Sequence, residues 1–270
     1  MKRPTVCLLL LLTSLLAVIC NSSAAATATP GDNGKPLVVG VRDGSPPFSS
    51  VNPATGKPEG FEVDLANALS KAMGKPFELR TVTGDGRVPM LQSHQIDLVI
   101  AVLTITPERE KQVSFSEPYF PSLVGVLVSK GSPIMQLKDL AGKTSCAPKG
   151  TVNQQVLEAS YAKMFGAAKF GELQLSSYQL CTLALRQGRA DFITTDLGTA
   201  LGLSKQDDTL RVLDKYFPGL QNAIGVAKDK PELVQDVNKG LKKLFTDGTW
   251  KELYLKWIGP PIPEGWPPGP

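Results

Sequence analysis

The alternation of short apolar stretches with helical patterns is the feature that most limits the fold. In the first half of the chain this alternation runs through residues 37–42, 60–74, 77–82, 87–95 and 96–102. It starts afresh through residues 143–148, 152–166, 172–177, 178–188, 190–195 and 197–204, with a weak strand at 210–214. Strands that alternate with helices predict mostly parallel sheets with helices on both faces. The expected fold class is therefore α/β, in two similar units arranged in tandem.

The C-terminal part departs from this alternation. Residues 223–229 predict one strand, and residues 231–248 and 249–259 predict two helices without a sheet of their own. If these helices return to the first unit, the chain crosses between the units twice, and the two crossings make a hinge. The expected first lobe spans residues 37–121 and the second lobe residues 122–221. Residues 222–258 are expected to return to the first lobe with the C-terminal helices, and residues 259–270 form a proline-rich tail.

The N-terminus is typical of a secretory signal over residues 1–26. Lys2 and Arg3 precede an apolar stretch that is too short for a membrane span, and small residues follow at the expected cleavage site. Cys20 suggests a lipid anchor as a less favoured alternative, because Ile19 stands where such sites need a small residue. The mature chain is expected in the periplasm or another extracytoplasmic space.

Charge and cysteines narrow the function classes. The formal net charge is +4, and loss of the predicted signal would leave +2 with no basic run, which argues against nucleic-acid binding. Cys146 and Cys181 remain in the mature chain, and two cysteines in an exported protein usually pair, although two buried thiols are the alternative. Because His94 is the only histidine, most zinc sites and histidine-based catalysis are disfavoured, and no cofactor or metal is expected.

Ligands of open parallel sheets bind beyond the carboxyl ends of the strands, where loops lead into helices. The loops at these positions hold a set of polar and cationic residues: Arg42, Arg87, Thr104, Arg109, Lys149, Gly150, Thr151 and Asp196. Three guanidinium groups and one ammonium group at one cleft favour an anion, and guanidinium offers two parallel donors to a carboxylate. Backbone N–H groups after Gly150 add to this. Phe48 is expected as a wall of the pocket.

The segment "TITPER" supports this interpretation. Thr106 fits a helix N-cap, Pro107 the first helical position, and Arg109 the first turn. A cation there faces the positive end of the helix dipole, which costs from a few tenths to about 1 kcal/mol. An anion held by both the helix start and Arg109 would explain why the arginine stands there.

Each of these residues also has a less specific explanation. Arg109 is alternatively a solvated helix residue eased by Glu108, and Asp196 is alternatively a helix N-cap. Arg42 and Arg87 are alternatively surface charges at strand ends. Thr104 is alternatively an ordinary strand residue, and Phe48 a core residue. Three acidic residues near the same loops are expected to face solvent: Asp43, Glu62 and Asp85.

Several motifs together resemble those of the bacterial extracellular solute-binding proteins, family 3, which are polar amino-acid receptors of ABC transporters. The motifs are "VGVRDGSPPFS", "GFEVDLANALSKAMG", "IDLVIAVLTITPERE", "VSFSEPYF", "LKDLAGKTSCAPKGTV", "LRQGRADFITTD" and "GTWKELYLKWIG", within residues 36–258. The resemblance implies a two-lobed fold of the periplasmic-binding-protein-like type II, with a two-strand hinge. It also implies a monomer that captures an amino acid and delivers it to a membrane permease.

The resemblance further implies roles for individual residues. Arg109 would clamp the α-carboxylate of the ligand, and Thr104 and Asp196 would hold the α-ammonium group. Gly150 and Thr151 would add contacts to the carboxylate from the second lobe.

Other positions concern selectivity and the disulfide. Val102 departs from the family pattern, in which small residues are frequent. Arg42 replaces the aspartate of relatives that take cationic ligands, and Arg87 resembles an arginine of relatives that bind glutamate and aspartate. Uncompensated buried charge disfavours a neutral guest, so an acidic amino acid is expected. The pair Cys146 and Cys181 resembles a disulfide of several glutamate-binding relatives.

Two other functions are alternatives to transport. An exported cyclohexadienyl dehydratase acting on prephenate or arogenate shares the fold, and Asp196 would be its proton donor. A sensor domain would need an attached membrane span and a signalling region. Transport, which needs no catalytic residue, is the preferred hypothesis.

Overall fold

The computed structural model describes residues 34–267, which belong to one compact unit. The predicted signal at residues 1–26, Cys20 and the last three residues of the tail lie outside the described residues. Over the described range, every helix falls short of the length and apolar character that a membrane crossing requires.

One nine-stranded sheet contains two parallel sets of strands. In the first set β1 lies between β4 and β5, with bounds Leu37–Arg42, Phe77–Val82 and Leu98–Val99. In the second set β7 lies between β8 and β9, with bounds Thr144–Pro148, Gly171–Leu175 and Phe192–Asp196. The expected α/β class with parallel strands therefore holds within each of the two lobes.

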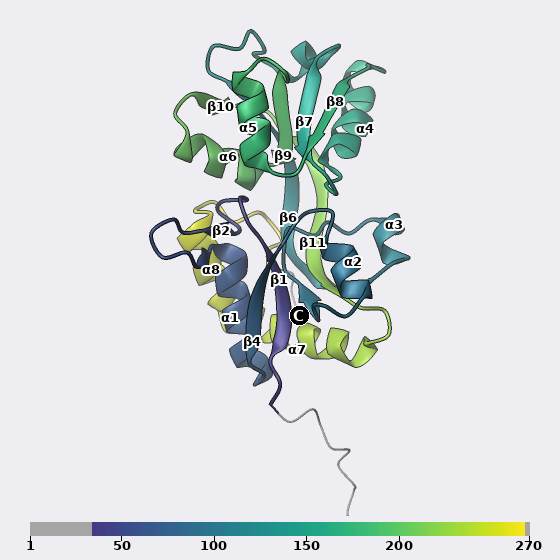
Figure 1. Cartoon of the computed structure of the whole chain (residues 1–270), viewed down its shortest axis with the longest axis vertical. Helices are drawn as coiled ribbons and strands as arrows, with labels where there is room; N and C mark the ends of the chain where they lie inside the picture. The colour runs from purple at the N-terminus through teal and green to yellow at the C-terminus, as the bar shows by residue number, and fades with distance from the viewer. Residues whose placement is uncertain (1–33, 268–270) are drawn as a thin grey trace, which may run out of the picture. The chain divides into compact units, whose positions relative to one another are not determined.

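Two long strands join these sets. The strands β6 (Ser114–Ser129) and β11 (Phe217–Val226) pair antiparallel with each other (Figure 1). In addition, β6 pairs with β9 of the second set, and β11 pairs with β5 of the first set. The short β10 (Leu210–Val212) also pairs with β6, and β2 (Ser50–Val51) pairs with β3 (Pro58–Glu59). These joining strands make the whole sheet mixed rather than mostly parallel.

The helices follow the predicted positions closely. Those before the first joining strand are α1, α2 and α3, with bounds Phe61–Met73, Arg87–Gln92 and Pro107–Glu110. Between the joining strands lie a short 3-10 helix and α4, α5 and α6, with bounds Leu137–Leu140, Asn153–Phe165, Tyr178–Arg186 and Leu197–Gln206. The C-terminal helices α7 and α8 span Pro231–Thr246 and Thr249–Trp257.

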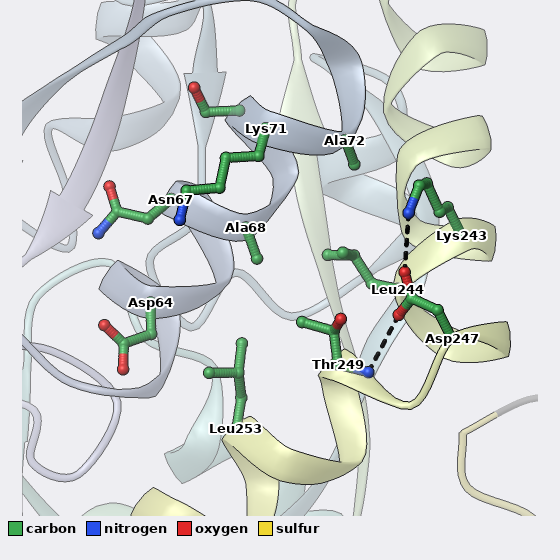
Figure 2. Close-up of a pocket in the computed structure, with 11 residues that line it drawn as sticks. Asp64, Asn67, Ala68, Lys71, Ala72, Lys243, Leu244, Asp247, Thr249 and Leu253 are labelled. Atoms are coloured by element: carbon green, nitrogen blue, oxygen red, sulfur yellow. Dashed lines mark hydrogen bonds and ion pairs between the residues drawn. The ribbon is translucent and has the colours of Figure 1, made fainter.

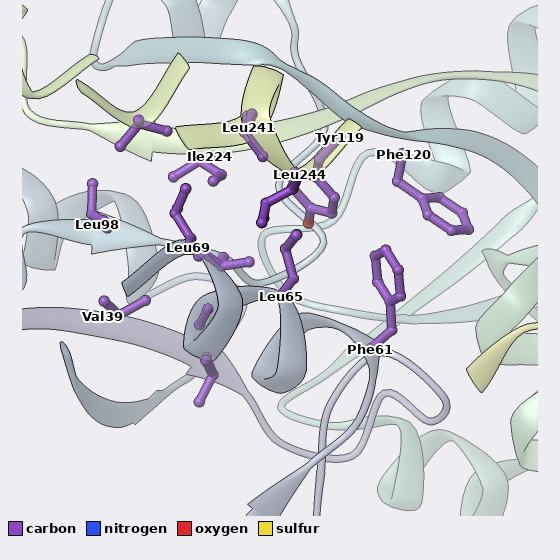
Figure 3. Close-up of a cluster of buried hydrophobic side chains, with 14 of the residues drawn as sticks. Val39, Phe61, Leu65, Leu69, Leu98, Tyr119, Phe120, Ile224, Leu241 and Leu244 are labelled. Atoms are coloured by element: carbon purple, nitrogen blue, oxygen red, sulfur yellow. The ribbon is translucent and has the colours of Figure 1, made fainter. Parts of the chain in front are cut away.

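The core of the first lobe explains why the C-terminal helices return to it. The apolar face of α1, including Leu65 and Leu69, packs against Leu241 and Leu244 of α7 (Figure 3). Trp250 of α8 is fully buried in the same cluster, and its indole N–H donates to the carbonyl oxygen of Tyr119 at 2.8 Å. Each such buried side chain contributes roughly 1.5–3 kcal/mol relative to exposure.

The second lobe contains the disulfide. Cys146 on β7 is bonded to Cys181 on α5, and both residues are fully buried in an apolar cluster with Tyr178, Leu185 and Ile193. The pairing that the resemblance implied is confirmed, and the alternative of two free thiols is wrong.

The predicted strand at 96–102 is shorter than expected, because only Leu98–Val99 pair in the sheet. Val102 has a φ of 50°, which interrupts the strand before Thr104 pairs with Asn222 of β11. The carbonyl oxygens of Ala101 and Val102 instead accept hydrogen bonds from the guanidinium group of Arg87. The carbonyl groups at the end of this predicted strand therefore bind the Arg87 side chain rather than a neighbouring strand.

Candidate functional site

Five charged side chains are buried in the described part of the chain: Arg42, Glu62, Arg87, Arg109 and Asp196. They come from the end of β1, the starts of α1, α2 and α3, and the end of β9. Electrostatic effects among them shift several pKa values, so the five groups form one cluster. Four of the five were predicted from their positions after strands.

The helix start at "TITPER" forms as predicted. Thr106 is the N-cap of α3, and its hydroxyl oxygen accepts a hydrogen bond from the backbone N–H of Arg109 at 3.2 Å. The Arg109 side chain is only 8% exposed and donates to the carbonyl oxygens of Thr104 and Gly150, both at 2.7 Å. Burial lowers the pKa of Arg109 to about 10, and the negative charge of Asp196 opposes this lowering. The alternative of a solvated arginine is therefore wrong.

Arg87 is more deeply buried than Arg109. Its guanidinium group donates to the carbonyl oxygens of Ala101, of Val102 at 3.0 Å and, from the opposite lobe, of Gly150 at 3.0 Å. Burial first, and then the nearby guanidinium groups of Arg109 and Arg42, hold the pKa of Arg87 well below its usual value. The alternative of a surface charge is wrong here also.

Arg42 makes a different contact across the lobes. It is 5% exposed, and its guanidinium carbon lies 5.0 Å from the ring centroid of Tyr178, at the start of α5. A guanidinium group over an aromatic face gains from the cation–π attraction and keeps its N–H edge available for other partners. Tyr178 was not predicted as a site residue, although it lies shortly after the end of β8, as the predicted site residues do after their strands.

Asp196 stands at the N-cap position of α6, as its alternative explanation held, but its carboxylate does not cap the helix. One oxygen accepts a hydrogen bond from the Ser122 hydroxyl at 2.5 Å, and the other accepts from the Asn153 amide at 3.4 Å. The carboxylate is thus buried and held by β6 and α4. It keeps its remaining acceptor capacity for a cationic group.

The other predicted residues lie in different environments. Phe48 is fully buried and packs on Phe120, with ring centroids 4.8 Å apart, so it is a core residue of the first lobe. A Cβ added to Gly198 of the second lobe would lie 2.9 Å from the Phe48 ring, so this ring also faces the opposite lobe. The hydroxyl of Thr151 donates to the Pro148 carbonyl at 2.8 Å, and Lys149 is exposed.

The loops after β4 and β7 approach each other through glycines. A Cβ on Gly84 would lie 2.6 Å from the carbonyl oxygen of Lys149, and a Cβ on Gly150 would lie 2.5 Å from the carbonyl oxygen of Gly84. Gly150 also has a φ of 74°, a conformation that glycine adopts without strain. Only bare backbone therefore fits at this contact between the lobes.

Glu62 is buried, contrary to the expectation that it faces solvent. It is fully buried, and one of its oxygens accepts hydrogen bonds from the backbone N–H of Val102 at 2.7 Å and from the Tyr119 hydroxyl. Its other oxygen is buried without a partner among the described residues. Burial raises the pKa of Glu62 to about 7, although both hydrogen bonds oppose this shift. Acidic residues are common in first helical turns, so no sequence signal distinguished it.

A separate hollow of about 730 Å³ lies on the first lobe between α1, α7 and α8 (Figure 2). Two of its charged residues pair with each other: the ammonium group of Lys243 lies 2.9 Å from the carboxylate of Asp247. The carboxylate of Asp247 also accepts from the backbone N–H of Thr249 at 3.0 Å. None of the five buried charges lines this hollow, so the candidate site is the cluster between the lobes.

Comparison with known proteins agrees with this geometry. The family described as bacterial extracellular solute-binding proteins, family 3, matches residues 37–260. The ABC transporter glutamine-binding protein GlnH of Bacillus subtilis is 34% identical, over 84% of this chain and 82% of the relative. The L-cystine-binding protein TcyJ of Escherichia coli is 34% identical, over 83% of this chain and 82% of the relative.

A solved structure described as an ancestral arginine-binding protein bound to glutamine superposes with a TM-score of 0.75. It is 35% identical, and the match covers 83% of this chain and 98% of that chain. The type II two-lobed fold implied by the sequence is thereby confirmed.

Proposed function

We propose that this chain binds an acidic amino acid. The chain belongs to the bacterial extracellular solute-binding proteins, family 3, and is a substrate-binding protein of an amino-acid ABC transporter rather than an enzyme. Glutamate or aspartate would bind between the two lobes. The relatives named above carry glutamine, cystine or arginine in their descriptions, so the acidic preference rests on this chain's own residues.

The balance of buried charge is the observation that carries the proposal. Three guanidinium groups, those of Arg42, Arg87 and Arg109, lie in a cluster whose acidic members are Asp196 and Glu62. Glu62 is only partly ionised near neutral pH because its pKa is about 7. A zwitterionic ligand with a neutral side chain adds no net charge. An acidic amino acid adds one negative charge and brings the cluster closer to neutrality, which a buried site favours.

The positions of the charges fit the groups of an acidic amino acid. Arg109 sits at a helix start and suits the α-carboxylate, because guanidinium and helix N–H groups both favour an anion. Asp196 and Thr104 suit the α-ammonium group. Arg42, with its face on Tyr178, presents its N–H edge to the carboxylate of the ligand side chain. Arg87 adds positive charge while its two terminal nitrogens hold backbone carbonyls, and its Nε is buried without a partner among the described residues.

Capture would involve closure of the two lobes about the joining strands. We divide the lobes at residues 37–121, 122–221 and 222–258, so that β6 and β11 form the hinge. The contacts of Arg87 and Arg109 with the carbonyl oxygen of Gly150 cross from one lobe to the other. A ligand bound by both lobes favours the closed form, which is the form that a permease can distinguish.

The family and the predicted signal together support an extracytoplasmic setting. The family is extracellular, and the predicted signal at residues 1–26 would direct the chain to the periplasm or another extracytoplasmic space. A disulfide between Cys146 and Cys181 suits such an oxidising compartment. The protein would act as a monomer that delivers its ligand to a membrane permease.

Isothermal calorimetry tests the ligand preference. The protein is first unfolded and refolded to remove carried-over ligand, and then titrated with glutamate, aspartate, glutamine and arginine. Arg42→Ala should reduce the preference for glutamate over glutamine by about 3 kcal/mol, roughly a hundredfold, because it leaves one buried charge of a pair uncompensated. Arg87→Ala should reduce the same preference, whereas Arg109→Ala should weaken all α-amino acids alike.

Arg80→Ala is the matched control, since it removes a guanidinium group from an exposed position on β4, where that group donates to the carbonyl oxygen of Gln95. Its ratio of glutamate to glutamine affinity should equal that of the native protein. An unchanged ratio in both Arg42→Ala and Arg87→Ala would show that the acidic assignment is wrong.

A further inference from the structure

We propose that Glu62 is a positioning residue of the binding site. It holds the backbone at Val102 and thereby positions Arg87, and its charge sets the preference for acidic over neutral ligands. The inference rests on the proposed function, because it takes Arg87 to belong to the anion-binding cluster. Glu62 itself needs no contact with the ligand in this role.

The backbone at Val102 is held from two sides. Its φ of 50° is an outlier for a β-branched residue, so neighbouring groups must maintain it. On one side, the Val102 N–H donates to the Glu62 carboxylate at 2.7 Å. On the other side, the Val102 carbonyl accepts from the Arg87 guanidinium group at 3.0 Å. Glu62, Val102 and Arg87 therefore form a continuous chain of hydrogen bonds that ends at the cluster.

The surroundings of Glu62 give its charge a direct effect on that cluster. The titratable groups that face it are the Tyr119 hydroxyl on β6, the Arg87 guanidinium on α2 and the Asp196 carboxylate on β9. The ionised carboxylate offsets part of the positive charge of Arg87. Protonation removes that offset and leaves the cluster more positive. Within residues 34–267 the second Glu62 oxygen has no hydrogen-bond partner, so only the first oxygen is held.

The consequence has a definite sign. Because burial raises the pKa of Glu62 to about 7, the group is mainly protonated below that pH and mainly ionised above it. Affinity for glutamate relative to glutamine should therefore rise as the pH falls through about 7. The side-chain carboxyl of the ligand itself stays ionised above about pH 5.5, so it does not produce this change.

Calorimetry with glutamate and glutamine from about pH 5.5 to about pH 8.5 tests the role of the charge. In the native protein the ratio of the two affinities should change by about fivefold or more, the lower end of typical coupling between sites. In Glu62→Gln the ratio should be independent of pH and close to the native value at low pH. A Glu62→Gln protein with the native pH profile would overturn the proposal.

His94→Gln is the control variant, because His94 is the only histidine in the chain. Its imidazole lies 3.4 Å from the Asp229 carboxylate and its side chain is 49% exposed, apart from the cluster. His94→Gln should keep the native pH profile. Loss of the profile in this variant would assign the titration to His94 and overturn the proposal.

A double-mutant cycle tests the positioning role. Glycine adopts the conformation of residue 102 without strain, so Val102→Gly should reduce the need for Glu62. The loss of glutamate affinity on Glu62→Ala should be smaller in the Val102→Gly background than in the native one, whereas additive losses would contradict positioning. If Glu62→Ala does not fold, the pH profiles of the native protein and Glu62→Gln still decide the proposal.

The two proposals fail in distinguishable ways. If Arg87→Ala and Arg42→Ala leave the ratio of glutamate to glutamine affinity unchanged, the acidic assignment fails, and this inference fails with it. If these variants lower the ratio but Glu62→Gln follows the native pH profile, only the inference about Glu62 fails.

Discussion

Replacing Glu62 with glutamine should stabilise the folded protein much more at high pH than at low pH. The carboxyl is fully buried, and burial raises its pKa from 4.5 to about 7. In the unfolded chain the carboxyl ionises near 4.5, whereas in the folded chain it keeps its proton until about pH 7. Its contribution to stability is therefore fully present below pH 4.5, is lost as the pH rises between these two values, and is constant above them.

The magnitude follows from the pKa difference. A shift from 4.5 to about 7 corresponds to about 3 kcal/mol of folding free energy. Glutamine has the same shape but does not titrate, so every other ionisable group cancels when variant and native protein are compared. The free energy of unfolding of Glu62→Gln minus that of the native protein should rise by about 3 kcal/mol across this pH window.

Urea unfolding at a series of pH values measures this difference. The fluorescence of the three tryptophans, all of which lie in or after α8, reports on the first-lobe core. His94→Gln, whose exposed side chain lies apart from the cluster, should show no comparable trend. The prediction is wrong if the difference in unfolding free energy between Glu62→Gln and native protein changes by less than about 0.5 kcal/mol from pH 4.5 to pH 8.

Two further predictions concern the second lobe and the contact between the lobes. Replacing Cys146 and Cys181 by alanine should lower the free energy of unfolding by about 4 kcal/mol, because the bond closes a loop with a separation of 35 residues. Denaturant titration checks this, and a loss below about 1 kcal/mol would contradict it. Gly84→Ala should weaken ligand binding in calorimetry, because its Cβ would lie 2.6 Å from the Lys149 carbonyl across the lobes. Gly131→Ala, which meets nothing within 4 Å, should bind normally, and equal affinities of the two variants would contradict the prediction.

The sequence predicted most elements of the fold because its periodicity is regular. The C-terminal helices and the helix start at Thr106 form where their patterns placed them. The joining strand β6 was not recognised as one long strand, because Pro118 and Pro121 interrupt an apolar run. Prolines are tolerated there because the pairing of β6 with β11 shifts register near them.

The candidate site was predictable where it depends on strand ends and not where it depends on burial. Arg42, Arg87 and Arg109 follow strands in loops that the topology brings together, so their convergence could be inferred. Glu62 lies in the first turn of a helix, where acidic residues are ordinarily solvated, and only the packing of Tyr119 and Val102 around it reveals its burial. Tertiary contacts of this kind leave no periodic signal in the chain.

A crystal structure of the refolded protein in complex with glutamate would show directly whether the buried arginines bind an acidic ligand. We expect the α-carboxylate of glutamate to lie within hydrogen-bond distance of Arg109 and its ammonium group near Asp196. We expect its side-chain carboxylate to lie within hydrogen-bond distance of Arg42. A complex in which the guanidinium group of Arg42 points into solvent, or in which the side-chain carboxylate is held without any of the three buried arginines, would contradict this expectation.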